Sequence, residues 1–222
     1  MKRREFLTVP ARTLGGVLIY NLQRETTLLS AQEKDVKVPL SFFTASEAIV
    51  VAAACERIFP SDESGPGAKE AGVVIYIDRQ LAGPYGRDKY RYTKGSWIES
   101  APEHGYQGRA TPREIYRAGT VALGTDFPTL SAARQDERLE TNHANDVLPD
   151  AAHAHGRSMF CDPMHGGNMG MLGWQMTGYP GPLMSYRDDL EKYRGVAYPR
   201  RKPRSLEQII GRKVQPWEDE ID

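Results

Sequence analysis

The chain contains little cysteine, no excess of charge and no long apolar run, and each shortage excludes a class of protein. Two cysteines cannot build a disulfide scaffold, nor supply the four thiolates of an all-cysteine iron–sulfur or zinc site. The 29 basic and 29 acidic residues leave no net charge, whereas nucleic-acid-binding domains show a basic excess or stripe. The mildly apolar stretch Val9 to Leu22 contains an arginine and is shorter than the ~20 residues that span a bilayer. We therefore expect no nucleic-acid partner and no transmembrane span.

Common catalytic motifs are missing too. The sequence has no Gly-x-Ser-x-Gly elbow, no phosphate-binding P-loop and no Cys-x-x-Cys-His haem attachment. Histidines and aspartates do gather between residues 143 and 165, without a recognised zinc-ligand spacing. These residues are His143, Asp150, His153, His155, Asp162 and His165. They leave open the alternative of a stand-alone exported enzyme that uses a His/Asp site, with or without a metal.

Residues 1–31 have the three-part plan of an export signal. A basic start is followed by an apolar stretch, and small residues precede Gln32. The start resembles the twin-arginine signal, in which two arginines and one further residue precede Phe-Leu, although Lys2 stands where Ser or Thr is usual. The matching residues are Arg3, Arg4, Phe6 and Leu7. Proteins with such a signal cross the membrane already folded, so this resemblance implies assembly before export.

Removal of this leader would change the charge balance of the chain. The leader holds five basic and two acidic residues, so the remainder keeps 24 basic and 27 acidic ones. The zero net charge is therefore the sum of a basic leader and a mildly acidic body.

Helical periodicity dominates the body, so we expect a mainly α fold with few strands. Thr44 and Glu47 form a capping box that opens a helix through Ile58, and this helix is apolar nearly all round, which predicts a central position. Three further helices are expected at residues 68–81, from Thr111-Pro112 onward, and at 131–142.

Two long segments, 84–110 and 161–222, hold most of the glycine, proline and aromatic residues and are expected to be irregular. Within the second, the glycine-rich stretch 165–170 lacks a preceding strand, which favours a tight turn with positive φ at its glycines and Asn168. We divide the chain into the leader 1–31, a small helical domain 32–182 and an extended tail 183–222.

The segment 160–181 carries a specific pattern. It reads Phe-Cys-Asp-Pro-Met-His-Gly-Gly-Asn, then Gly173-Trp174, then Gly-Tyr-Pro-Gly. This pattern resembles the signature of the gluconate 2-dehydrogenase subunit 3 family, the small (gamma) subunits of periplasmic FAD-dependent sugar and polyol dehydrogenases. An earlier block, Arg57 to Pro60 with Gly67-Ala68 and Ala71-Gly72-Val73, agrees with it, as does the leader.

The resemblance implies a mainly helical accessory subunit with no chemistry and no cofactor of its own. Its expected partner is a glucose-methanol-choline-type flavoprotein that holds FAD and in some cases an iron–sulfur cluster, and a multihaem cytochrome c can accept the electrons. On this basis we expect a partner interface at the signature, and we expect the tail to wrap the partner. The interface residues are Phe160, Asp162, Pro163, Gly166, Gly167, Asn168, Trp174, Tyr179 and Pro180.

Three points stay open at the sequence level. Trp174 is either an anchor for the partner or a core residue. Cys161 is a candidate for a disulfide with Cys55 or with the partner, or else a plain surface thiol, while Cys55 is expected to be a buried core thiol. The polar stretch 146–157 holds a proline and a glycine where the family has an apolar helix, so the arrangement before Phe160 is undecided.

Overall fold

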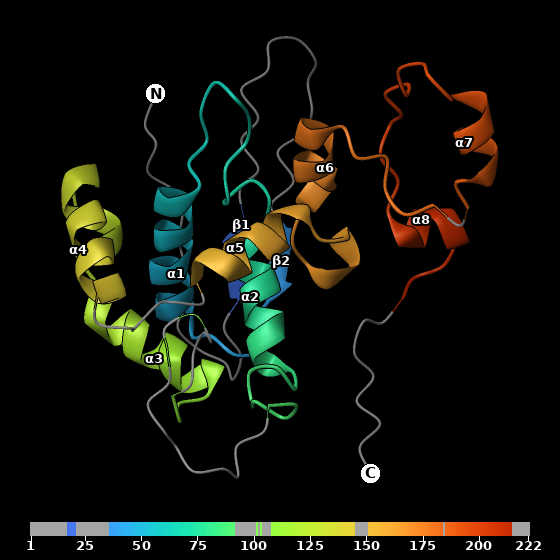
Figure 1. Cartoon of the computed structure of the whole chain (residues 1–222). Coiled ribbons are helices and arrows are strands. Elements are labelled where there is room, and N and C mark those ends of the chain that lie inside the picture. Colours follow the sequence, from blue (N-terminus) through green and yellow to red (C-terminus); the bar gives the residue numbers. More distant parts are fainter. Residues whose placement is uncertain are drawn as a thin grey trace.

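A computed structural model shows how the elements are arranged (Figure 1). It describes residues 17–20, 36–91, 101, 103, 108–144, 151–183 and 185–214. The longer helices are α1 (Ala45–Ile58), α2 (Val73–Ala82), α3 (Pro112–Leu123), α4 (Ala132–Ala144) and α5 (Ala151–Phe160). The shorter ones are η2 (Phe127–Thr129), η3 (Pro163–His165), η4 (Met169–Met171), α6 (Leu172–Thr177), α7 (Arg187–Lys192) and α8 (Leu206–Ile210). The mainly α fold is thereby confirmed.

Two short strands accompany these helices. Strand β1 (Val17–Tyr20) pairs antiparallel with β2 (Val36–Pro39), with Val17 opposite Pro39. Strand β1 lies inside the predicted leader, and the signal residues Arg3, Arg4, Phe6 and Leu7 lie outside the described residues. Export therefore stays a prediction. Among the described residues, no helix combines the length and the hydropathy that a membrane crossing needs.

Helix α1 is central, as its sequence predicts. The Thr44 hydroxyl accepts from the Glu47 amide and the Glu47 carboxylate accepts from the Thr44 amide, so the capping box forms. One face of α1 enters a core cluster with α2, and the opposite face enters a second cluster with Leu123 and Phe127. Figure 1 shows α1 between α2 and α4. Cys55 is 2% exposed in the first cluster, which confirms it as a core thiol.

Helix α2 begins later than the apolar spacing predicts. The spacing predicts a helix over 68–81, but residues 68–72 form turns and the helix starts at Val73. The reason is Gly72, whose φ of +71° is a left-handed conformation outside the helical region. A Cβ at Gly72 would also lie 2.5 Å from the Met169 sulfur. The glycine thus ends the turn and lets the 165–170 segment approach α2.

The region before and after Phe160 is more helical than its composition indicates. Helix α5 begins at Ala151 and ends at Phe160, which settles the arrangement that the sequence left undecided. The segment 161–222, expected to be irregular, contains the short helices η3, η4, α6, α7 and α8. Several of these end or begin at local caps, and helices of three to six residues are too short to show a 3.6-residue apolar period.

Candidate functional site

The glycine-rich stretch after α5 forms a rigid turn. Left-handed φ values occur at Gly166 (+95°), Asn168 (+47°) and Gly170 (+64°), as the sequence predicts for a tight turn. Gly167 has no positive φ, yet it also needs to be glycine, because a Cβ there would lie 2.3 Å from the Ser158 carbonyl oxygen. The turn therefore packs backbone against backbone on the last turn of α5.

Asn168 ties the two ends of this turn together. Its side chain is fully buried, with 0% exposed. Its Nδ2 donates to the Cys161 carbonyl at 2.8 Å and its Oδ1 accepts from the Gly173 amide at 2.8 Å. Both polar ends of the amide are thus satisfied within the chain. Asn168 therefore stabilises the turn from inside, and the solvent-accessible surface of this site is formed by neighbouring residues.

The turn also joins the two sequence blocks that carry the family resemblance. The Met169 amide donates to the Ala71 carbonyl at 3.0 Å, next to Gly72. On the other side, a Cβ at Gly166 would meet the Arg79 guanidinium at 2.7 Å. The sequence alone does not predict the contact between Met169 and Ala71, because the two blocks lie far apart along the chain.

Trp174 is a core residue, which decides between the two roles that the sequence left open. Its side chain is 4% exposed and its indole N–H donates to the Phe160 carbonyl at 2.7 Å. Tyr179 packs edge-on against the indole, with ring centroids 5.1 Å apart. Tyr179 and Phe160 are 40% and 41% exposed, so they provide the accessible aromatic area of the site.

Asp162 links the signature to the tail. Its Oδ1 accepts from the Met164 amide at 3.1 Å, which caps η3, and Pro163 is the first residue of that helix. Its Oδ2 accepts from the Leu206 amide at 2.7 Å, at the start of α8. The carboxylate therefore serves two backbone amides 42 residues apart, Met164 and Leu206.

A second bond holds the tail nearby. The Pro180 carbonyl accepts from the Arg204 amide at 3.1 Å, and Gly181 is buried against the Arg204 backbone. The tail thus leaves the body through α7 and returns to it at α8, as Figure 1 shows in red. The wrapping of a partner by this tail stays a prediction.

These elements enclose an open groove of about 540 Å³. Its lining is Phe160, Asp162, Met164, His165, Trp174, Thr177, Tyr179, Pro182 and Leu206. Four of the predicted interface residues lie on it, namely Phe160, Asp162, Trp174 and Tyr179. Three others, Gly166, Gly167 and Asn168, are buried in the turn behind it. Leu206 was missed by sequence reasoning, because only the fold brings α8 to the signature.

Cys161 sits beside this turn as a half-buried thiol. Both cysteines are free in the structure, so Cys161 is not bonded to Cys55. Its sulfur donates to the Ser158 carbonyl at 3.4 Å, and burial raises the pKa of the thiol to about 11. A thiol with this pKa is almost wholly protonated near neutral pH and reacts slowly.

Two of the His/Asp residues of the alternative hypothesis, Asp162 and His165, line the groove. His153 and His155 lie in α5, and Asp150 lies outside the described residues. Both carboxylate oxygens of Asp162 accept hydrogen bonds from backbone amides. Within the described ranges, no group of three or more His, Cys, Asp or Glu residues could hold a metal.

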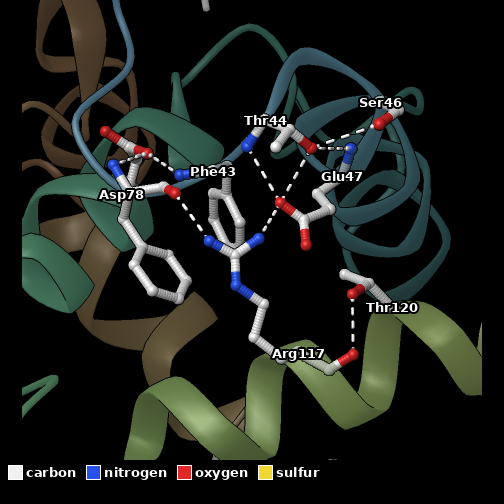
Figure 2. Close-up of polar contacts among 8 residues, drawn as sticks. Phe43, Thr44, Ser46, Glu47, Asp78, Arg117 and Thr120 are labelled. Carbon is white, nitrogen blue, oxygen red and sulfur yellow. Dashed lines mark hydrogen bonds and ion pairs between the residues drawn. The ribbon is translucent and has the colours of Figure 1, made fainter. Parts of the chain in front are cut away.

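A separate polar cluster fixes the chain where it enters α1 (Figure 2). Asp78 of α2 accepts from the amides of Ser41, Phe42 and Phe43 at 2.7 to 3.0 Å. Arg117 extends from α3 to bind the Phe42 carbonyl and Glu47. Three helices thus hold the segment that joins β2 to α1.

The comparisons with known proteins yield one match. A family model described as gluconate 2-dehydrogenase subunit 3 matches residues 45–181, more than half of the chain. No curated protein and no solved structure matches. The matched region runs from the first residue of α1 to the Gly181 that ends the signature, so it includes the turn and leaves out the tail.

Proposed function

We propose, because this chain belongs to the gluconate 2-dehydrogenase subunit 3 family, that it is the non-catalytic small subunit of an FAD-dependent sugar dehydrogenase complex. The family match over residues 45–181 is the observation that carries this proposal. Its partner would be a glucose-methanol-choline-type flavoprotein, which holds the FAD and performs the oxidation. An iron–sulfur cluster in that partner and a multihaem cytochrome c as electron acceptor belong to the same proposal.

The use of polar groups at the signature supports an accessory role. Asp162, Asn168 and Trp174 direct their hydrogen bonds to backbone groups of this chain. The accessible groups include the aromatic side chains of Phe160 and Tyr179. Such amphipathic aromatic area is typical of the anchors at protein interfaces.

We further propose that the leader exports the complex to the periplasm. A twin-arginine signal on this chain would carry a folded, FAD-loaded flavoprotein that has no signal of its own. The small subunit would then be required both for the stability of its partner and for its location.

The direct test is expression of the flavoprotein with and without this chain in the native host. We expect loss of periplasmic, flavin-loaded flavoprotein when the chain is absent. The double substitution Arg3→Lys and Arg4→Lys is expected to leave the complex in the cytoplasm with its flavin bound, which separates export from maturation. Unchanged flavin loading and location without this chain would contradict the proposal.

A second assay addresses the stand-alone enzyme. The purified chain, without the flavoprotein, is expected to show no sugar oxidation and no stoichiometric metal. Turnover by the isolated chain would favour the His/Asp alternative between residues 143 and 165.

A further inference from the structure

The groove at the signature is completed by two residues from outside the region that the family model matches, Pro182 and Leu206. Phe160, Trp174 and Tyr179 form its walls within residues 45–181, and Leu206 forms a wall from the tail. Asp162 holds Leu206 in place through the 2.7 Å bond to its backbone amide. Part of the groove surface is therefore a feature of this chain's own tail.

Two exposed arginines lie beside the groove. Arg200 is exposed, and its Nε lies 3.5 Å from the position that a Cβ on Gly178 would take, next to Tyr179. Arg204, also exposed, is held beside the groove through the bond of its amide to Pro180. The tail 183–222 holds nine basic and eight acidic residues, and four of the basic ones are gathered in the short segment 200–204.

Two acidic side chains at the groove, Asp162 and Glu207, accept hydrogen bonds from backbone amides of this chain. Both oxygens of Asp162 accept backbone amides, and Glu207 accepts from the Val214 amide at 2.9 Å. An incoming chain would therefore meet a lining that is mainly apolar and includes the hydrogen-bonded Asp162 carboxylate, with Arg200 and Arg204 at its edge.

On the basis of the proposed function, we infer that this groove is the docking site for a segment of the flavoprotein that carries one aromatic or long aliphatic side chain flanked by carboxylates. A volume of about 540 Å³ lies within the range of clefts that bind ligands in proteins. Burial of such a side chain between Phe160, Tyr179 and Leu206 supplies the affinity. Carboxylates beside it would be attracted by Arg200 and Arg204 and would speed the encounter.

The tail then acts as the specificity element of the interface. The body offers Phe160 and Tyr179 from the family region, whereas the position of Leu206 and the basic edge depend on residues beyond 181. Small subunits with a different tail would present a different wall to their flavoproteins. This residue arrangement accounts for how one fold can select among related partners.

The inference is tested with the purified flavoprotein as the probe, by biolayer interferometry over a series of salt concentrations. Phe160→Ala and Leu206→Ala are each expected to weaken the equilibrium affinity about tenfold or more. Arg200→Glu is expected to lower the association rate about three- to tenfold at low salt and to reduce its salt dependence. The matched controls are Tyr90→Ala, an aromatic side chain that is 80% exposed, and Arg187→Glu, an exposed arginine of α7.

Circular dichroism melting verifies that each variant is folded. Equal effects of the groove and control variants, or no effect of either, would overturn the docking site while leaving the subunit role intact. Failure of the wild-type chain to bind the flavoprotein would overturn both. An unchanged affinity and an unchanged salt dependence of Arg200→Glu would contradict the claim that carboxylates flank the docking side chain of the flavoprotein.

Discussion

A single buried carboxylate, Asp78, organises the entry to the helical body. It is 1% exposed in α2 and accepts three backbone N–H groups from residues 41–43. An acid directly after the apolar run Val73 to Ile77 is conspicuous in the sequence, but its partners lie 35 to 37 residues away. Figure 2 shows that the same segment is also approached by Arg117.

Removal of this carboxylate is expected to be costly. Asp78→Ala leaves three backbone amides in the 41–43 segment without their acceptor, at about 1 to 3 kcal/mol for each that stays buried. We expect a loss of ~3 kcal/mol or more in the free energy of unfolding, measured by urea denaturation. Asp188→Ala, on exposed α7, is the control and is expected to change it by less than about 0.5 kcal/mol. Equal midpoints for the two variants would contradict this role.

Glu47 predicts a pH dependence of stability. Burial acts to raise its pKa, but hydrogen bonds from Arg117 and Thr44 outweigh burial and hold the pKa below the ordinary value of 4.5. A carboxylate with a depressed pKa in the folded state stabilises the fold above the unfolded pKa, and this contribution is lost as the pH falls through the folded value.

Glu47→Gln should therefore destabilise the protein at pH 7 and flatten its loss of stability below about pH 4.5. Thermal melts between about pH 7 and pH 3 measure this. Glu137→Gln, on an exposed position of α4, should follow the wild-type profile. Parallel profiles for wild type and Glu47→Gln would argue against the linkage.

At the scale of elements, two glycines show different reasons for the effect of a substitution. At Gly156, within α5, helix propensity decides the effect, and at Gly167, after α5, packing decides it. Gly156 lies exposed in α5, and a Cβ there would have nothing within 4 Å, while a Cβ at Gly167 would collide with the Ser158 carbonyl at 2.3 Å. Gly156→Ala is expected to stabilise the protein by ~0.5 to 1 kcal/mol, because alanine favours helix. Gly167→Ala is expected to destabilise it by ~2 kcal/mol or more, because backbone has to move. Melting temperatures that shift in the same direction would refute this contrast.

The return of the tail to the body depends on Asp162. Asp162→Ala removes the acceptor of the Leu206 amide and the cap of η3. We expect faster hydrogen exchange across α8, with little change in α1 and α2, as measured by mass spectrometry on peptides. Asp188→Ala serves again as the control, since its carboxylate lies on α7. Unchanged exchange in α8 would show that other contacts hold the tail.

At the scale of the whole molecule, the core and the tail are separable. The two core clusters and the side chains packed against them draw on residues from Leu40 to Met176. Figure 1 shows the tail at the edge of the helical body, with α7 farthest from it. The stability of the body therefore comes from the two core clusters, whereas the shape of the groove also depends on Leu206 of the tail.

A chain that ends at Pro182 is accordingly expected to keep its helical circular dichroism and to melt within a few degrees of the full chain. Its affinity for the flavoprotein should fall about tenfold or more, because Leu206 and the basic edge are gone. Loss of cooperative melting would show that the tail is part of the folding unit. An unchanged affinity would place the docking site elsewhere.

The sequence alone determined the features that depend on neighbouring residues. The capping box at Thr44, the helix start at Thr111-Pro112 and the helix stop after Ile58 involve groups within a few positions of one another, and all three occur as predicted. The family was likewise readable from residues 160–181, since the signature that resembles it lies within one continuous segment of the sequence.

Only the tertiary structure decided the features that depend on distant segments. Whether Trp174 is buried follows from the approach of α5, and the bond between Asp162 and Leu206 spans 44 residues. The apolar spacing misplaces the start of α2, which is set by the left-handed Gly72, and this glycine lies against Met169, far along the chain. Burial and long-range hydrogen bonds arise from packing, which no local pattern encodes, and this is why the groove became visible only in the folded chain.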